Sequence, residues 1–358
     1  MADLSPIPVV DIRAGGPLLH AQEGEARARA LRIACLQWFP LVSRPVMPLL
    51  DYLTKRWLVR AGSPYVDEIR AVARHLRFPG IWFLNGSYQW CCTALAREEA
   101  GAPWLVRTLD WPFPGLGRYV EIAHMRGPAG EFHNVTWPGY VSVLTALAPG
   151  RFAASINQAP MKRTTHGRFL RLYDLGRNAI ETFVHARDLP PDQLLRQVFE
   201  TCRTYRDARL MLETTPLARP VIFTLVGCAR GERCVIERTE RGGRTRELET
   251  SAANDWLTGD STWEARIGAR KLLSSTYEDA AANSRARREA LAGWPGRFAD
   301  SNFDWVEPPV LNEFTRIAVE MCPATGVLRV LGYEVTNKGD LPAPATLPGE
   351  VRTERVAA

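Results

Sequence analysis

The amino-acid sequence predicts an α+β fold, a sandwich of two antiparallel β-sheets between layers of helices, preceded by a helical N-terminal segment. Two observations support this prediction. Stretches with apolar residues three and four positions apart, typical of amphipathic helices, open the chain and return further on. Between them lie short runs of β-branched and aromatic residues bounded by Gly and Pro, which favour strands. Strands, helices, strands, helices and strands, in that order, are what such a sandwich produces.

The composition is that of an ordinary globular protein. The chain has 358 residues, of which 46% are hydrophobic and 23% charged, enough for one large domain or two smaller ones. Its formal charge of +6 comes largely from arginines spread through helical stretches with acidic neighbours. The densest basic run, 285–288, is short and amphipathic, so we expect no nucleic-acid partner.

No targeting, membrane or metal-binding pattern occurs in the sequence. The first residues lack a basic region followed by an apolar one, and no apolar run is long enough to span a membrane. Seven cysteines, an odd number and mostly widely spaced, indicate reduced thiols and a cytoplasmic protein. Without a C-x-x-C pair, an H-E-x-x-H helix, a phosphate loop or a G-x-G-x-x-G run, we expect neither a metal ion nor a cofactor.

The elements begin with helices and continue with strands. Helical spacing over 23–39, 43–60 and 65–77, broken by Pro or Gly, predicts that residues 1–91 are mainly helical. From Ile81 on, strand-like runs predict a meander of antiparallel strands. These runs are IWFLNGSY (81–88), CCTALA (91–96), PWLVRTLDW (103–111), RYVEIAHM (118–125), YVSVLTAL (140–147) and RFAASIN (151–157).

The second half repeats this alternation. Helical spacing returns over 168–214, with breaks at Pro190-Pro191 and near Tyr205, and a further helix is expected over about 261–291. Residues 92–340 then form one domain, and 341–358, rich in Pro, Thr and Gly, a loose tail. The strand-like runs are PVIFTLVG (220–227), CVIERT (234–239), RELETSA (246–252), and a last hairpin of TRIAVEMC (315–322) and GVLRVLGYEV (326–335).

One predicted hairpin concentrates residues with chemical uses. A Cys-Thr pair opens its first strand at Cys92, Gly101 reverses the chain, and the second strand brings Arg107 and Asp110 back to the start. A nearby guanidinium lowers the pKa of a thiol, and a carboxylate can hold a free α-amino group that acts as the local base. The alternative interpretation is a buried structural cysteine beside an Arg–Asp ion pair.

This hairpin resembles the acid ceramidase and N-acylethanolamine acid amidase family, part of the choloylglycine hydrolase and penicillin V acylase group of N-terminal-nucleophile (Ntn) hydrolases. The family pairs Leu-Asn-x-x-Tyr-Glu, Cys-Thr-Ser and Gly-Arg-Asn-x-Asp-Trp/Phe, and the corresponding runs here are 84–89, 92–94 and 106–111. The residues that depart from the family pattern are Gln89, Ala94, Val106 and Thr108. The resemblance covers about residues 80–335 and implies the Ntn-hydrolase αββα fold.

Two landmarks further along the chain also resemble the family. They imply that Asn157 and Asn254 are the two oxyanion asparagines, and that the arginine following the second is Arg266, with Arg270 left open. Taken alone, Asn157 is typical of a turn before Pro160, and Asn254 of a helix cap or a loop. The matching runs are GRFAASIN (150–157), CVIE (234–237) and SAANDW (251–256).

Two adjacent cysteines are candidates for the nucleophile. Cys92 is followed by Thr, as in the family, whereas Cys91 has the more usual spacing to Arg107 and Asp110. We favour Cys92, because a deletion in the exposed turn 97–101 would change the spacing at little cost.

The resemblance implies a mechanism in which the chain cleaves itself before Cys92. The freed α-amino group, held by Asp110, then accepts the thiol proton as the sulfur attacks an amide carbonyl. Arg107 steadies the thiolate, while Asn157 and Asn254 stabilise the oxyanion. The implied substrate is a linear N-acyl amine such as an N-acylethanolamine.

Other interpretations stay open. The implied protein partner is the retained fragment 1–91, and a homo-oligomer is left undecided. The chain could instead be an inactive Ntn-fold ligand-binding protein, an acyltransferase, or a Cys–His hydrolase with His124 or His133 as its base. The aromatic residues near the site fit an acyl pocket and an ordinary core equally well; they are Trp111, Phe113, Trp137 and Trp256.

Overall fold

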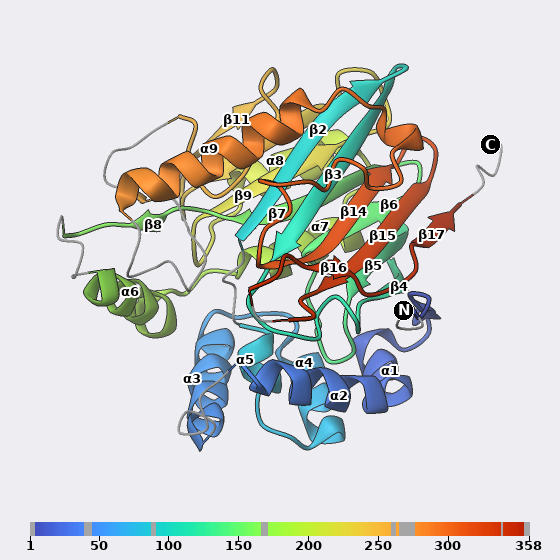
Figure 1. The fold of residues 1–358 in the computed structure, drawn as a ribbon. Coiled ribbons are helices and arrows are strands. Elements are labelled where there is room, and N and C mark those ends of the chain that lie inside the picture. Colours follow the sequence, from blue (N-terminus) through green and yellow to red (C-terminus); the bar gives the residue numbers. More distant parts are fainter. Residues whose placement is uncertain are drawn as a thin grey trace.

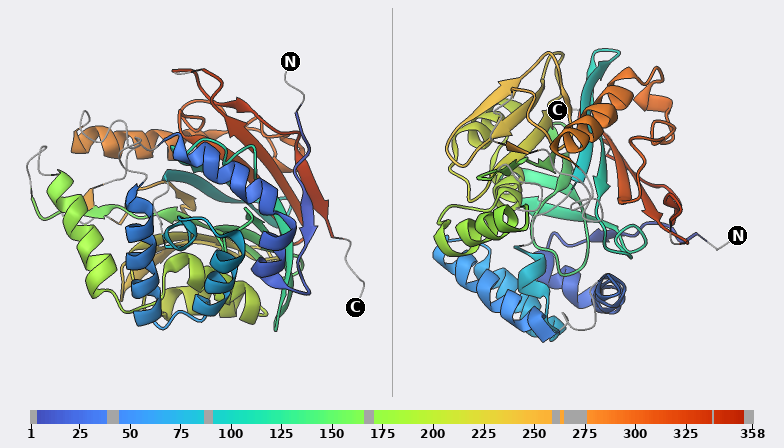
Figure 2. Two further views of the ribbon diagram at one scale, coloured as in Figure 1. Left: turned by 90° about the horizontal axis from the view of Figure 1, so that it is seen from below. Right: turned by 60° about the vertical axis from the view of Figure 1, so that its left-hand side comes forward.

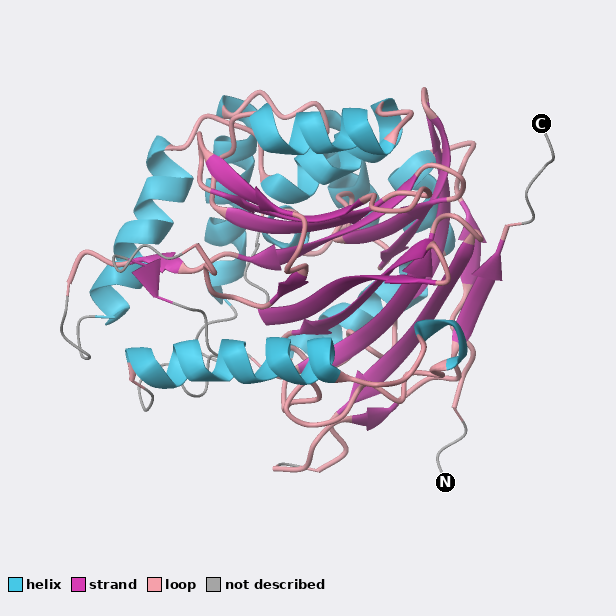
Figure 3. Ribbon diagram, turned by 90° about the horizontal axis from the view of Figure 1, so that it is seen from above, coloured by secondary structure: helices cyan, strands magenta, loops and turns pink. Residues whose placement is uncertain are grey.

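Two β-sheets lie face to face between helices (Figures 1 and 3). The computed structural model describes residues 4–38, 45–86, 91–165, 171–258, 263–264, 276–337 and 339–353. The first sheet is eight-stranded, in the order β1-β4-β5-β6-β7-β9-β10-β11. Its strands are β1 (Val9–Asp11), β4 (Glu121–Gly127), β5 (Gly130–Thr136), β6 (Thr145–Ala148), β7 (Phe152–Gln158), β9 (Val221–Val226), β10 (Arg233–Arg238) and β11 (Gly243–Arg246).

The second sheet has the order β12-β2-β3-β14-β15-β16, with β17 also paired to β15. A separate short pair joins β8 (Met161–Lys162) and β13 (Trp263–Glu264). The strands of the second sheet are β2 (Cys91–Glu99), β3 (Ala102–Asp110), β12 (Ser251–Ala252), β14 (Thr315–Cys322), β15 (Val327–Glu334), β16 (Ala343–Pro344) and β17 (Gly349–Arg352).

Helices cover the outer face of each sheet, which gives the four-layer order seen in Figure 3. The helices α7 (Pro191–Thr201) and α8 (Tyr205–Thr214) pack on the first sheet, and α9 (Tyr277–Gly293) packs on β2 and β12 of the second. Because strand side chains alternate between faces, one set from each sheet fills the space between them. That core includes Leu105 and Leu109 from the second sheet and Ile122, Val135 and Leu147 from the first.

The N-terminal segment is a group of helices at one end of the sandwich (Figure 2). It contains α1 (Gly16–Glu23), α2 (Glu25–Leu36), α3 (Met47–Arg60), α4 (Val66–Leu76) and the short α5 (Ile81–Leu84). A separate apolar cluster around Trp57, Ile69 and Leu76 holds these helices together, and Val141 joins it from the sandwich. Further along, α6 (Arg171–Ile180) continues into the π-helix η3 (Glu181–His185), which packs on α3, and η5 (Phe298–Asp300) is a short 3-10 helix.

Several buried polar contacts join this segment to the sandwich. The β1 strand pairs in parallel with β4. The His20 imidazole Nε2 lies 2.5 Å from the Glu121 carboxylate, and both side chains are buried. The buried Asn85 side chain donates to the Gly139 carbonyl at 3.0 Å and accepts from the Val141 N–H at 2.7 Å. The segment is therefore part of one structure with the sheets.

The predicted sandwich is confirmed, with corrections in detail. The segment 81–88, predicted as a strand, begins with the α5 helix; an apolar run as short as IWFL fits either state. Within 140–147 only Thr145–Ala148 is strand, and β5 was not predicted because GEFHNVT mixes polar and apolar residues. The meander is also divided, since β2 and β3 belong to one sheet and β4 to β7 to the other.

Two further expectations need correction. The sheets are not wholly antiparallel, because β1 runs parallel to β4. The tail predicted to be loose from 341 on forms β16 and β17, which pair with β15. A Pro-rich segment can still form a short edge strand of this kind, because the N–H groups on the outer side of an edge strand need no partner strand. The predicted helix over 261–291 is seen as α9 in its second part, whereas 265–275 lie outside the described residues.

The contacts of Asn85 make a prediction for stability. Asn85→Ala would leave the Gly139 carbonyl and the Val141 N–H buried without these partners, and we expect it to lower the free energy of unfolding by about 2–3 kcal/mol. Denaturant unfolding measures this change. Asn337→Ala, which removes an exposed amide that binds the nearby Asp340 carboxylate, is the control and should have an effect below about 0.5 kcal/mol. Equal losses in both variants would contradict the role of Asn85.

Candidate active site

The β2–β3 hairpin decides which way each candidate side chain points. Cys92 pairs with Leu109 and Ala94 with Arg107, so Cys92 and Arg107 share the face turned toward the other sheet. Cys91 pairs with Asp110, and these two side chains share the opposite face, on which α9 packs. The turn uses left-handed backbone at Ala100 and Gly101, with φ of 50° and 80°.

Cys92 is fully buried, and its thiol lies against a guanidinium. The Arg107 Nη2 is 2.8 Å from the Cys92 Sγ, and the backbone N–H of Asp110 also donates to the sulfur. Burial raises the pKa of the Cys92 thiol, because the interior disfavours the thiolate, while Arg107 acts in the opposite direction. In the intact chain the thiol form is therefore favoured.

Arg107 connects both sheets at this point. Its side chain is buried and donates to the Thr145 hydroxyl on β6 at 2.6 Å and to the Ile156 carbonyl on β7 at 3.1 Å. These bonds fix the guanidinium beside the Cys92 sulfur.

Asp110 lies on the other face of β3, in a polar setting. Its Oδ1 accepts from the Thr315 hydroxyl at 3.0 Å and its Oδ2 from the Asn312 amide at 2.9 Å. The Arg287 Nη1 is 3.7 Å from the same Oδ2. Burial raises the pKa of Asp110, and Arg287 is the largest of the influences that oppose this rise.

The two asparagines assigned to the oxyanion site lie next to the nucleophile strand, yet their N–H donors are bound to carbonyls. The Asn254 Nδ2 donates to Gln158 at 2.9 Å, while its Oδ1 accepts from the Cys92 N–H at 3.0 Å. The Asn157 Nδ2 donates to the carbonyls of Ala252 and Ala253, at 3.3 and 3.1 Å. In this structure Asn254 thus positions the backbone nitrogen of Cys92.

Sequence reasoning missed Arg287, which belongs to this cluster. Its buried guanidinium donates through Nη1 to the Cys92 carbonyl at 2.8 Å and to the Thr93 hydroxyl at 2.8 Å, and through Nη2 to the Asn254 Oδ1 at 2.9 Å. In the sequence, the run 285–288 was considered only as a short, amphipathic basic run and a candidate for nucleic-acid binding. The spacing of Ala280, Ser284 and Leu291 around Arg287 was the available signal for a buried face, because small and apolar residues recur there at helical spacing.

Two of the other predicted residues, Arg266 and Arg270, lie outside the described residues. His124 and His133 stack on each other on β4 and β5, with ring centroids 4.5 Å apart, and His124 binds Glu131 at 2.8 Å. The groups that contact Cys92 come instead from Arg107, Asp110, Asn254 and Arg287. This arrangement does not support a Cys–His pair.

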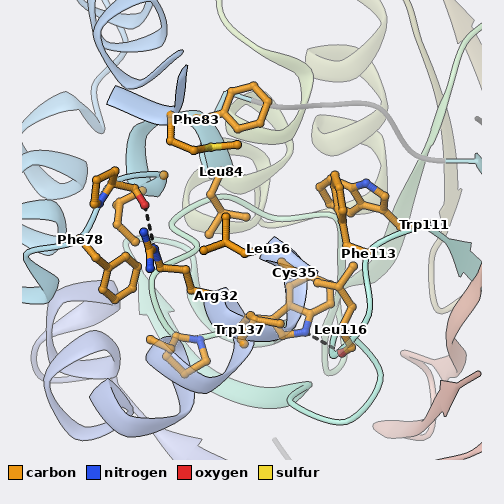
Figure 4. A pocket seen from close by; sticks show the side chains of 17 residues that line it. Arg32, Cys35, Leu36, Phe78, Phe83, Leu84, Trp111, Phe113, Leu116 and Trp137 are labelled. Atoms are coloured by element: carbon orange, nitrogen blue, oxygen red, sulfur yellow. Dashed lines mark hydrogen bonds between the residues drawn. The ribbon is translucent and has the colours of Figure 1, made fainter. Parts of the chain in front are cut away.

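One cavity borders the hairpin, and a second lies beside the segment that follows it. A polar cavity of about 250 Å³ lies on the α9 side and is lined by Cys91, Asp110, Arg287 and Asn312. An apolar groove of about 100 Å³ lies between α2, α5 and the segment after β3 (Figure 4). Side chains that line it include Leu31, Cys35, Phe83, Trp111, Phe113 and Trp137.

Three of the four aromatic residues singled out from the sequence thus line the groove. Trp256 does not; it packs edge to face on Trp263, with ring centroids 5.8 Å apart. Among the described residues, no three His, Cys, Asp or Glu side chains gather as metal ligands would. Within the same residues, every helix is too short or too polar to cross a bilayer.

Comparison with known proteins gives relatives of one kind. The chain is 25% identical to the acid ceramidase of Heterocephalus glaber over 220 residues, covering 56% of this chain and 53% of that protein. It is 26% identical to the N-acylethanolamine-hydrolyzing acid amidase of Cavia porcellus over 217 residues, covering 58% and 54%. The chain spans about half the length of the curated relatives it matches. No protein-family model matches it.

Solved structures of the same group align with lower similarity. The Caenorhabditis elegans ortholog of N-acylethanolamine-hydrolyzing acid amidase is 18% identical, covering 65% of this chain and 93% of that one, with a TM-score of 0.43. A mutant conjugated bile acid hydrolase of Clostridium perfringens is 9% identical, covering 73% and 92%, with a TM-score of 0.38. The sequence matches confirm the resemblance that the nucleophile hairpin indicated.

The burial of Cys92 makes a prediction for its titration. In the intact chain we expect the pKa of this thiol to lie above the ordinary value, because burial outweighs the effect of Arg107. The thiolate absorbance of the native chain minus that of Cys92→Ala, followed through alkaline pH, measures it. Arg107→Met should raise this pKa further, and a pKa below the ordinary value in the intact native chain would contradict this account.

Proposed function

From its sequence similarity to acid ceramidases and N-acylethanolamine-hydrolyzing acid amidases, we propose that this chain is a cysteine Ntn hydrolase that cleaves a linear N-acyl amide. One observation carries the proposal. The sulfur, the nitrogen and the carbonyl oxygen of Cys92 each contact a different buried polar side chain, those of Arg107, Asn254 and Arg287. The backbone groups of any buried residue need partners, but a cysteine that only fills a core needs no guanidinium at its sulfur.

The proposed reaction requires a base, and the α-amino group of Cys92 would supply it. A buried thiol with a raised pKa needs a proton acceptor close by before it can attack. Cleavage of the bond between Cys91 and Cys92 creates an amine on the residue that carries the thiol. The Asn254 Oδ1, which accepts the Cys92 N–H in the intact chain, would then accept one N–H of this amine.

Self-cleavage and substrate hydrolysis would both pass through a thioester on the Cys92 sulfur, but only substrate hydrolysis could use the free amine as its base. In cleavage, the Cys92 sulfur attacks the Cys91 carbonyl, the C–N bond breaks as the nitrogen takes up a proton, and water hydrolyses the thioester. With substrate, the sulfur attacks the amide carbonyl, the amine leaves with the proton from the thiol, and water releases the acid. Arg107 would stabilise the negative charge on sulfur.

We also propose that the oxyanion is stabilised by Asn157 and Asn254, and that Arg266 is the family's arginine that follows the second asparagine. For the two asparagines to serve as oxyanion donors, their N–H groups would have to leave the carbonyls of Gln158 and of Ala252 and Ala253. In other acyl-transfer enzymes each such donor contributes on the order of 3 kcal/mol.

The apolar groove supports a substrate with an acyl chain. Trp111 follows directly after Asp110, so the groove begins one residue from the polar cluster. Its side chains, seen in Figure 4, are almost all apolar, as an acyl chain would require. Because α2 and α5 form one wall, the proposal also requires that residues 1–91 stay bound after cleavage, in a protein that we predict to be cytoplasmic.

The proposed function predicts self-cleavage. We expect intact mass measurements, after incubation from mildly acidic to neutral pH, to show a fragment that begins at Cys92 together with the fragment 1–91. Cys92→Ala should stay whole, because the attacking sulfur is absent, and Cys91→Ala should be cut as the native chain is. The two fragments should elute together in size exclusion.

The outcomes separate the interpretations. A native chain that stays whole yet hydrolyses amides would favour a base other than the amine, and one that does neither would favour an inactive ligand-binding protein. With a fluorogenic N-palmitoyl aminocoumarin amide as the probe, release of palmitic acid indicates hydrolysis. An N-palmitoyl product formed from added ethanolamine indicates acyl transfer.

The groove makes a second prediction. Cys35→Phe should fill part of the space and raise KM for palmitoyl amides about tenfold, with a smaller effect on butanoyl amides, because the long chain loses apolar contact. Ile33→Phe, on the exposed side of the same helix, is the matched control and should change neither. Equal effects on both chain lengths would place the acyl group elsewhere.

A further inference from the structure

Arg287 is a buried cation that the proposed reaction leaves without a task. Its side chain is 2% exposed and comes from α9, on the outer face of the second sheet. Burying a guanidinium is costly unless its donors are bound, and replacing it with an apolar side chain is often neutral or stabilising. Stability alone therefore does not explain why this guanidinium is placed beside residue 92.

The guanidinium holds Cys92 at both ends of the residue. It donates directly to the Cys92 carbonyl at 2.8 Å, and it donates at 2.9 Å to the Asn254 Oδ1, which accepts the Cys92 N–H at 3.0 Å. A second bond of Nη1 to the Thr93 hydroxyl fixes the next residue of the strand. Since two donors meet at the Asn254 Oδ1, Arg287 also determines which way this amide faces.

We propose that Arg287 is a positioning residue which, once the chain is cut, holds the new amino terminus of Cys92 in place and favours its uncharged form. The inference rests on the proposed function, because it concerns an amine that only cleavage creates. In the intact chain the nitrogen is held from both sides by covalent bonds. After cleavage only the Cys92 carbonyl side remains covalent, and the contacts with Arg287 and Asn254 replace the lost constraint.

Charge explains the second part of the proposal. An ammonium group close to a guanidinium is disfavoured, so Arg287 lowers the pKa of the amine, and the neutral amine is the form that accepts a proton. Asp110 acts in the opposite direction, but it is shared with Arg287 at 3.7 Å and with the Thr315 and Asn312 donors.

On the α9 side of residue 92, Arg287 is the charged side chain whose substitution tests the effect of charge on this residue. Charged groups further out are paired with each other: Arg288 binds Asp255 at 2.9 Å and Arg246 binds Glu237 at 3.0 Å. The titratable groups that face residue 92, among the described residues of β2, β3 and α9, are Cys91, Arg107, Asp110 and Arg287.

The test compares three proteins after cleavage: the native chain, Arg287→Met and Arg287→Lys. For each, kcat/KM for the N-palmitoyl aminocoumarin amide is measured against pH, because the acidic limb reports the group that must be unprotonated. Removal of the Arg287 positive charge should raise the pKa of both the amine and Asp110. Arg287→Met should therefore move the acidic limb of the kcat/KM profile about one pH unit higher. Its kcat should fall on the order of tenfold to a hundredfold.

Arg287→Lys separates charge from geometry. It keeps the positive charge but not the fork that binds two acceptors, so its limb should stay at the native pH while kcat falls at unchanged KM. If Arg287→Met does not fold, Arg287→Lys alone can still test the proposal. An acidic limb of its kcat/KM profile that is shifted by about one pH unit, or a kcat equal to that of the native chain, overturns the proposal. The control is Arg238→Met, which removes an equally buried arginine bound to the Leu212 and Thr215 carbonyls and should leave the limb unmoved.

The outcomes also distinguish this inference from the proposed function. A native chain that is neither cut nor active overturns both. A native chain that is cut and active, with Arg287→Met showing the native rate and the native limb, overturns only the role of Arg287.

Discussion

The guanidinium of Arg107 is a permanent charge between two apolar sheets, and much of the surrounding structure follows from the need to satisfy it. Arginine does not lose its proton at ordinary pH, so its donors must find acceptors inside the protein. Those acceptors come from β6, β7 and β2, and they include the Cys92 sulfur. The spacing of the two sheets at this end is therefore set by polar contacts, whereas apolar packing fills the rest of the core.

The nucleophile strand lies between two such cations. Arg107 approaches Cys92 from the inner face of the sheet and Arg287 from the outer face, while Asp110 is the carboxylate close to both. This balance leaves the start of β2 electropositive. A site of this kind stabilises negative charge on the Cys92 sulfur, because the Arg107 guanidinium already lies beside it.

The sequence allowed the hairpin to be predicted, because its parts are neighbours along the chain. Cys92, Arg107 and Asp110 follow from strand length, a glycine turn and alternation, all of which are local. Arg287 could not be found in this way, since its contact with Cys92 spans 195 residues and its helix is rich in charged residues. The same reliance on tertiary contacts explains why α5 was predicted as a strand. Four consecutive apolar residues fit a helix and a strand equally well, and contacts with the rest of the fold determine which one forms. Asn157 and Asn254 were singled out only by the resemblance to a family, and their oxyanion roles, like that of Arg266, remain predictions.

The way in which the N-terminal segment is built into the molecule has a consequence for its lifetime. An uncut chain regains β1, the helix cluster and the contacts of Asn85 in a unimolecular reaction, because one chain carries all of them. Once the bond before Cys92 is broken, the same contacts can re-form only when two separate chains meet, at a rate that falls with dilution. Under the proposed self-cleavage, folding would therefore have to precede cutting, and the cut protein would persist through slow unfolding rather than through repeated refolding.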